Sequence, residues 1–200
     1  MKRSSLRVAM ALLAWSVAAA TTAQTPPAAV PPGPMVLSSP AFADYGVLPP
    51  KYAPNAAGMV TFNAINPPLA WTRPPPRTVA YAVTMIDLDS SQGGNPGDVP
   101  LWMVVNIPAS TPALAEGIAR GRTSMLPEGA FQRSFLTNGY IGPQPGANRR
   151  SHHYLFELYT LDRMLDVPRD VSLDQLRNAV KGHETGERRV LVATCCLGSR

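Results

Sequence analysis

Proline is the residue that most restricts how this chain can fold, because 14 of its 22 prolines lie before residue 77. A proline inside a helix removes a backbone hydrogen bond and clashes with the preceding turn, so long helices are not expected there. In sheets, proline is confined to edge strands, strand starts and bulges. The first part of the chain is therefore expected to form loops, turns and short edge strands.

Four apolar runs further along have the length and composition of buried β-strands. They cover residues 79–86, 101–107, 154–161 and 189–194. One amphipathic helix is expected after Ser172, which can cap it while Gln175 completes a capping box. Many strands and one late helix predict a mostly antiparallel β domain with a small helical component.

The N-terminal 23 residues have the three parts of a secretory signal peptide. Lys2, Arg3 and Arg7 are positive, residues 8–20 are apolar except for Ser16, and small residues end the segment at Ala23. We expect a cleaved leader over residues 1–23, a proline- and alanine-rich lead-in over 24–37, and one domain over 38–200. The protein would then be periplasmic or secreted. The apolar run is too short for a permanent membrane anchor. A lipid anchor is not expected either, because there is no cysteine near the cleavage site.

The composition and net charge of the chain limit the classes of protein to which it can belong. The chain is 45% hydrophobic and 16% charged, which is typical of a globular domain with a real core. Without the leader it has 18 − 3 = 15 basic and 13 acidic residues. The resulting net charge of +2 does not indicate a nucleic-acid-binding protein. The two cysteines, Cys195 and Cys196, are adjacent, have no zinc-ligand spacing, and are interpreted mainly as buried thiols, with pairing to another chain as the alternative. No metal or cofactor is expected.

Two polar motifs follow or begin apolar runs. Asp87 and Asp89 end the first run, and their spacing on an extended chain places both carboxylates on one side. The alternative is that both satisfy backbone amides of a turn. His152 and Tyr154 begin the third run, share a face, and can both donate hydrogen bonds. In the alternative interpretation, one histidine of the His152–His153 pair is solvated and the other supports a turn.

A third motif is the glycine- and proline-rich segment 139–146, which would let backbone approach a ligand closely. An ordinary surface turn is the alternative. Arg149 and Arg150 follow it and could supply positive charge, although a solvated pair is the default expectation.

Taken together and in order, these motifs resemble the phosphatidylethanolamine-binding protein family, and most of all its bacterial branch, often described as Raf-kinase-inhibitor-like. The resemblance covers roughly residues 38 to 194, and it rests on the shared order and spacing of its motifs. The matching stretches are Ser39–Asp44, Asn66–Trp71, Asp87–Asp89, Val104–Ala109, Gly139–Pro143, His152–Phe156, Leu158–Asp162 and Lys181–His183.

The resemblance implies a large antiparallel sheet packed with a smaller sheet, plus peripheral helices that include one near the C-terminus. It also implies a small surface pocket for anions such as phosphate or a phospholipid head group. Carried onto this sequence, the ligand-binding residues are Asp87, Asp89, His152 and Tyr154, with Gly142 and Pro143 in the pocket wall.

This sequence departs from the family pattern at several positions. Leu88 replaces a usual proline, Ser90–Ser91 replace an alanine–proline pair, and His153 stands where arginine is common. Leu101, five residues before Asn106, replaces a histidine and can neither donate a hydrogen bond nor carry charge. A lost charge-assisted hydrogen bond of about 1.5–3 kcal/mol would weaken anion binding by one to two orders of magnitude.

Three functions remain open at this stage. The preferred one is an exported binding protein for a small anionic or phosphoryl ligand. The second is an interaction protein that inhibits an exported protease or other hydrolase through the pocket rim. The third is a weak hydrolase that uses the Asp/His pocket, with Ser90 or Ser91 as nucleophile, but the sequence identifies no activating base for either serine.

Overall fold

The computed structural model describes residues 33–53, 64–92, 95–96, 98–121, 123–143 and 151–195. All of them belong to one compact unit, Pro32–Arg200. The expected leader, most of the lead-in, Arg149, Arg150 and Cys196 lie outside the described residues. The expectations made for those segments therefore stay predictions.

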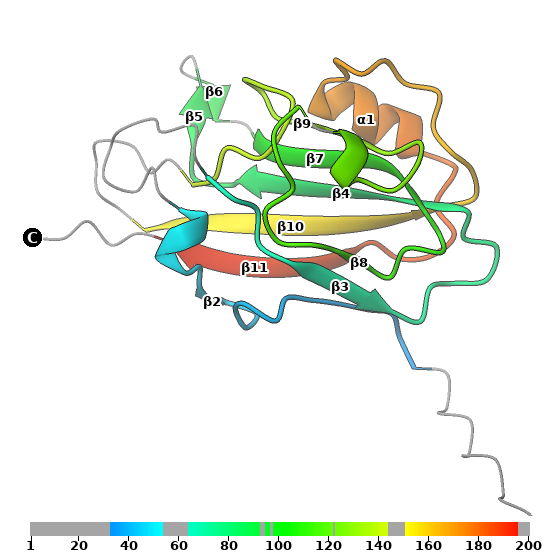
Figure 1. Ribbon diagram of the computed structural model, residues 1–200, viewed down its shortest axis with the longest axis horizontal. Coiled ribbons are helices and arrows are strands. Elements are labelled where there is room, and N and C mark those ends of the chain that lie inside the picture. The colour runs from blue at the N-terminus through cyan, green and yellow to red at the C-terminus, as the bar shows by residue number, and fades with distance from the viewer. Residues whose placement is uncertain are drawn as a thin grey trace, which may run out of the picture. The chain divides into compact units, whose positions relative to one another are not determined.

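The main layer of the fold is a large sheet. In the described residues its strand order is β2-β11-β10-β4-β7-β9 (Figure 1). Its strands are β2 (Gly46–Val47), β4 (Ala80–Asp87), β7 (Val99–Pro108), β9 (Phe131–Arg133), β10 (His152–Leu161) and β11 (Arg189–Cys195).

The four long strands of this sheet confirm the four apolar runs predicted from the sequence, each within two residues of its expected bounds. Neighbouring strands are antiparallel, except that β2 runs parallel to β11. The expected large antiparallel sheet is therefore present, with one parallel pair at its edge.

A smaller sheet in the order β1-β3-β8 packs on one face of the large sheet. It consists of β1 (Val36–Ser38), β3 (Leu69–Thr72) and β8 (Ala113–Leu114). Trp71 of β3 meets Tyr81 of β4 edge-on, with 5.2 Å between the ring centroids. Met35, just before β1, is buried in this core, so the packed structure begins inside the segment expected as a lead-in.

The remaining elements are short. Strands β5 (Ser91–Gln92) and β6 (Asn95–Pro96) form a separate pair, and η1 (Pro50–Tyr52) and η3 (Thr123–Met125) are single 3₁₀ turns.

The opposite face of the large sheet is covered in part by α1 (Leu173–Val180). The predicted capping box is confirmed. Ser172 Oγ accepts from Gln175 N at 3.2 Å, and Gln175 Oε1 accepts from Ser172 N at 2.9 Å. Leu173 and Leu176 pack in one buried cluster with Met103 and Val105 of β7. Within the described ranges, no helix is long and apolar enough to cross a membrane.

Strand pairing places the two polar motifs at one end of the sheet. β4 ends at Asp87, its antiparallel neighbour β10 begins at His152, and Asp87 lies opposite Tyr154 in the register. Asp87 and His152, which are 65 positions apart in the sequence, therefore become neighbours.

Cys195, at the end of β11, is buried and disulfide-bonded. Cys195 is therefore not the buried free thiol that the sequence analysis favoured.

Candidate functional site

The centre of the candidate site is a buried pair formed by Asp87 and His152. Asp87 is 2% exposed and His152 is 4% exposed. His152 Nδ1 lies 3.1 Å from Asp87 Oδ1 and 3.0 Å from Oδ2. Because a carboxylate only accepts hydrogen bonds, Nδ1 is the donor, and the other ring nitrogen, Nε2, is left for a ligand. Pairing also offsets the cost of burying the carboxylate.

Tyr154 lies beside this pair on the same face of β10. Its ring stacks near that of His152, with 6.3 Å between the centroids. The side chain is fully buried, and its hydroxyl has no hydrogen-bond partner in the described part of the chain. Burial, and then the negative charges of Asp87 and Asp89, raise the pKa of Tyr154 far above its ordinary range. The hydroxyl therefore stays protonated and can donate a hydrogen bond.

Asp89 takes a different partner from Asp87. Its Oδ2 accepts from His153 N at 2.7 Å and lies 2.8 Å from His153 Nδ1. Both side chains of this second pair are about half exposed. The hydrogen bond from the His153 backbone N–H is the largest cause that lowers the pKa of Asp89. The two carboxylates are adjacent, since Asp89 N donates to Asp87 Oδ1 at 3.0 Å, but only Asp87 belongs to the buried centre.

Gly142 and Pro143 are buried in the loop that follows β9 and lies beside β7. Ile141 N donates to Leu101 O at 3.2 Å, which fixes this loop to the strand. Gly142 has φ +70°, and a Cβ there would lie 2.8 Å from Tyr52 O. Glycine is therefore required at this position for both its backbone conformation and its close approach to η1.

Leu101 is buried in the same apolar cluster as Tyr140 and Tyr154. It lies at an irregularity of the β4–β7 pairing, where Ile86 is opposite Pro100 and Met85 is opposite Trp102. An apolar side chain thus occupies the position at which the family pattern has a histidine.

Two buried tyrosines near Gly142, Tyr140 and Tyr52, had no role in the sequence analysis. Tyr140 Oη donates to Tyr52 O at 2.8 Å, and its ring meets Trp102 edge-on at 5.7 Å. Burial raises the pKa of Tyr140 well above its ordinary range. Tyr140 lies inside the glycine- and proline-rich segment 139–146, whereas no feature of the local sequence distinguishes Tyr52.

The described residues contain no group of three or more side chains arranged to hold a metal ion. Ser90, considered as a nucleophile, makes no hydrogen bond to His152 or His153 in the described structure. The side chain of Ser91 lies outside the described part.

The sequence matches the phosphatidylethanolamine-binding protein family over residues 38–194. The chain belongs to this family. A UPF0098 protein from Methanothermobacter thermautotrophicus is 32% identical over 161 residues, which is 78% of this chain and 96% of that protein.

Two further relatives extend this result to bacteria. The crystal structure of Escherichia coli YbcL, described as a member of the mammalian PEBP family, superimposes with a TM-score of 0.71 at 22% identity. It covers 82% of this chain and 99% of that one. A Mycobacterium tuberculosis protein named "Putative lipoprotein LppC" is 27% identical over 172 residues, 86% of this chain and 78% of that protein. The predicted mostly β fold is confirmed by the structural similarity to YbcL. The predicted bacterial branch is confirmed by the sequence relatives, which include Escherichia coli YbhB, 34% identical over 128 residues, 62% of this chain and 77% of that protein.

Proposed function

We propose that this family member is a binding protein whose pocket takes a small anionic ligand with a phosphoryl group, such as a phospholipid head group. The observation that carries the proposal is the Tyr154 hydroxyl, which is buried without a partner in the described chain, beside the Asp87–His152 pair. A buried donor without a partner costs about 1–3 kcal/mol. A ligand oxygen at this point would remove that cost.

The chemistry of the site assigns a role to each residue. Asp87 orients the His152 ring through Nδ1 and balances its charge, so that protonated Nε2 can donate to a ligand oxygen. The Tyr154 hydroxyl supplies a second donor, and backbone near Gly142 and Pro143 forms the wall. Asp89 lies at the rim, where it holds the loop after β4 against His153.

This mechanism predicts that binding depends on pH. A neutral His152 has its single proton on Nδ1, facing Asp87, and Nε2 then repels an anion. Affinity for a phosphoryl ligand should therefore fall between about pH 5 and 8, the range in which a histidine side chain ordinarily loses its charge. An affinity that stays constant from about pH 5 to 8 would exclude protonated His152 as the main donor.

The test is calorimetric titration of phosphate and phosphorylethanolamine into the purified protein. Tyr154→Phe removes only the hydroxyl, and His152→Ala removes the oriented ring. His153→Ala is the matched control, because its side chain contacts only the exposed Asp89 in the described structure. We expect saturable binding that weakens about tenfold or more in the first two variants and changes little in the third. Equal binding by all four proteins would contradict the proposal.

We also propose that the protein is exported. Its N-terminal 23 residues have the composition of a signal peptide, and the name of the LppC relative describes a lipoprotein. Cell fractionation and N-terminal sequencing test this point. A mature protein that begins near Gln24 outside the cytoplasm supports it, and an intact Met1 in the cytoplasmic fraction would refute it.

A further inference from the structure

The disulfide at Cys195 joins two residues that are adjacent in the sequence. Cys195 is disulfide-bonded, and the chain contains only one other cysteine, Cys196. Within one chain, Cys196 is therefore the partner. Cys196 lies outside the described residues, and Cys195, the last residue of β11, gives the position of the bond in the fold.

This disulfide cross-links almost none of the chain. A disulfide stabilises a folded protein mainly by restricting the unfolded chain, and this effect grows with the number of residues in the closed loop. Here the loop contains only the two cysteines themselves. The bond is therefore expected to contribute little to global stability, and its effect is confined to the backbone at the end of β11.

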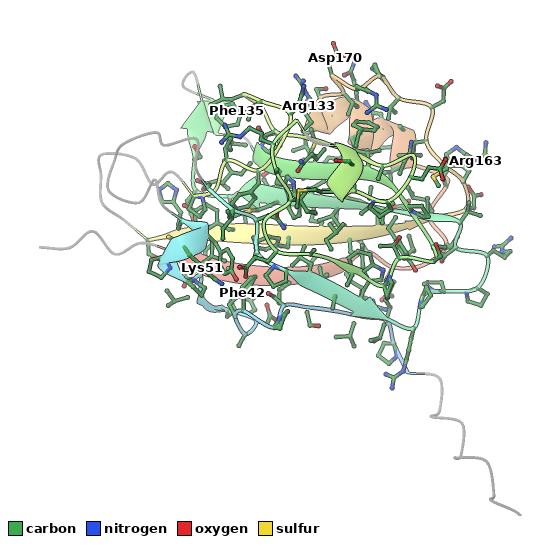
Figure 2. All side chains as sticks on the ribbon, viewed as in Figure 1. Phe42, Lys51, Arg133, Phe135, Arg163 and Asp170 are labelled. Atoms are coloured by element: carbon green, nitrogen blue, oxygen red, sulfur yellow. The ribbon has the colours of Figure 1, made fainter. Side chains whose placement is uncertain are left out.

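The end of β11 supports the candidate site. Cys195 lies directly opposite His152 in the β10–β11 register. Side chains that are directly opposite in an antiparallel pair lie on the same face, with Cβ atoms about 4.5–5.5 Å apart. Ser151 Oγ also donates to Cys195 O at 3.2 Å, and Cys195 is buried in the same apolar cluster as Tyr154. Figure 2 shows the side chains at this end of the sheet, where Lys51 is labelled.

His152 and Cys195 form the terminal pair of the ladder between these two strands. His152 is the first residue of β10 and Cys195 is the last residue of β11, so in the described structure no further pair supports them on one side. Strand ends open more easily than strand centres. The His152 ring must nevertheless stay 3.0–3.1 Å from the two Asp87 oxygens. A bond that restricts the backbone at Cys195 restrains the ladder at the point where it would otherwise fray.

We propose that the Cys195–Cys196 disulfide positions His152, and that reduction of this bond weakens anion binding at the candidate site. Reduction by a dithiol breaks the S–S bond, leaves two cysteine thiols, and converts the dithiol into a disulfide of its own. The end of β11 is then held by its hydrogen bonds and packing alone, and the His152 ring is no longer held at its distance from Asp87. The loss of binding rests on the proposed function, whereas the change at His152 does not. Disulfides persist in oxidising compartments, so an exported protein would keep the site in its binding state.

The test compares the oxidised protein with the same protein reduced by dithiothreitol. The chain has three histidines, so NMR can follow each histidine ring, and His152→Ala identifies the signals of His152. We expect reduction to shift the His152 ring signals and to weaken phosphate binding, measured by calorimetry, about tenfold. Reoxidation should restore both. His183 is the internal reference, because it lies 3.3 Å from Asp162, just after the other end of β10, and its signals should not change.

Cys196→Ala is the matched control for the reductant. It removes the disulfide and leaves the Cys195 thiol in place, so it should behave like the reduced protein with or without dithiothreitol. His152 signals that do not move on reduction would overturn the proposal, as would equal phosphate affinity in the oxidised and reduced forms of a protein that binds phosphate. Loss of the His183 signals together with those of His152 would also overturn it, because the bond would then support the whole fold. If the oxidised protein binds no phosphate and reduction still moves the His152 signals alone of these two, the positioning role stands and the proposed function fails.

Discussion

Asp87 presents both of its carboxylate oxygens to a single ring nitrogen of His152, at 3.1 and 3.0 Å. The two side chains come from neighbouring strands and are almost completely buried. This contact fixes the orientation of the ring and occupies Nδ1, so that only Nε2 remains for the proposed ligand. The availability of Nε2 therefore depends on Asp87, although Asp87 itself carries the wrong charge to attract an anion.

The first prediction concerns the stability of this pair. Asp87→Ala leaves a buried histidine without its acceptor, so we expect the free energy of unfolding to fall by about 3–5 kcal/mol. Asp87→Asn keeps an acceptor of similar size and should cost about 1–2 kcal/mol. Denaturant unfolding at neutral pH measures both values. A loss below about 1 kcal/mol for the alanine variant would show that the pair is not an important contact.

The second prediction concerns the ionisation of Tyr154. Because burial and two nearby carboxylates raise its pKa, the contribution of Tyr154 to stability is fully present below its ordinary pKa near 10 and decreases above that pH. Tyr154→Phe should leave the tyrosinate absorbance of the folded protein unchanged up to about pH 11. Tyr45→Phe removes an exposed phenol and is the control expected to lower that absorbance. A loss of absorbance with Tyr154→Phe would mean that the hydroxyl is in contact with solvent.

The elements predicted correctly from the sequence are those in which a single local property, such as a long apolar run or a capping box, determines the structure. The apolar runs that became β4, β7, β10 and β11 are long enough that hydrophobic burial decides their structure. The capping box at Ser172 was predictable because its hydrogen bonds are local. The strands β1, β2, β8 and β9 have two or three residues each, and their pairing is set by the larger sheet and the core rather than by their own composition.

The candidate site was also predictable from the sequence only where a local rule applies. Alternation along β10 correctly placed His152 and Tyr154 on one face, and the register brought Asp87 opposite Tyr154. The same rule did not foresee that Asp89 would bind His153, because Asp89 lies beyond the end of β4, where strand alternation no longer applies. The role of Tyr140 depends on a contact with Tyr52 across 88 residues, which no local pattern reveals.

The third prediction uses the pH dependence of the Asp89–His153 pair. The pKa of Asp89 is below its ordinary value of 3.8, so its stabilising contribution is present above that value and is lost as pH falls through the lowered pKa. Asp89→Asn should reduce the free energy of unfolding at pH 7 by about 0.5–1 kcal/mol, a small effect because the pair is half exposed. The difference between the two proteins should vanish at pH values below the lowered pKa. A difference that persists there would assign the effect to packing rather than to charge.

The fourth prediction separates two reasons for glycine at position 142. Gly142→Ala places a Cβ at positive φ and 2.8 Å from Tyr52 O, so we expect a loss of about 2–4 kcal/mol in the free energy of unfolding. Gly117→Ala is the matched control, because Gly117 has φ +73° and no heavy atom within 4 Å of the added Cβ. That control should cost only about 1–2 kcal/mol. Equal losses of unfolding free energy in the two variants would mean that the loop containing Gly142 can move away from η1.

The last prediction concerns Leu101, which occupies the position of a histidine in the family pattern. Leu101→His should strengthen phosphate binding about tenfold or more, by supplying a charge-assisted hydrogen bond from the position at which the family pattern has a histidine. The gain should be larger at pH 6 than at pH 8, since only protonated histidine carries the charge. It should be accompanied by a loss of about 1–3 kcal/mol in stability, because the new polar ring enters an apolar cluster. Leu101→Met keeps the side chain apolar and should leave affinity unchanged at both pH values. If Leu101→His and Leu101→Met bind phosphate equally, the side chain at position 101 does not face the ligand, and the second donor must come from elsewhere in the pocket.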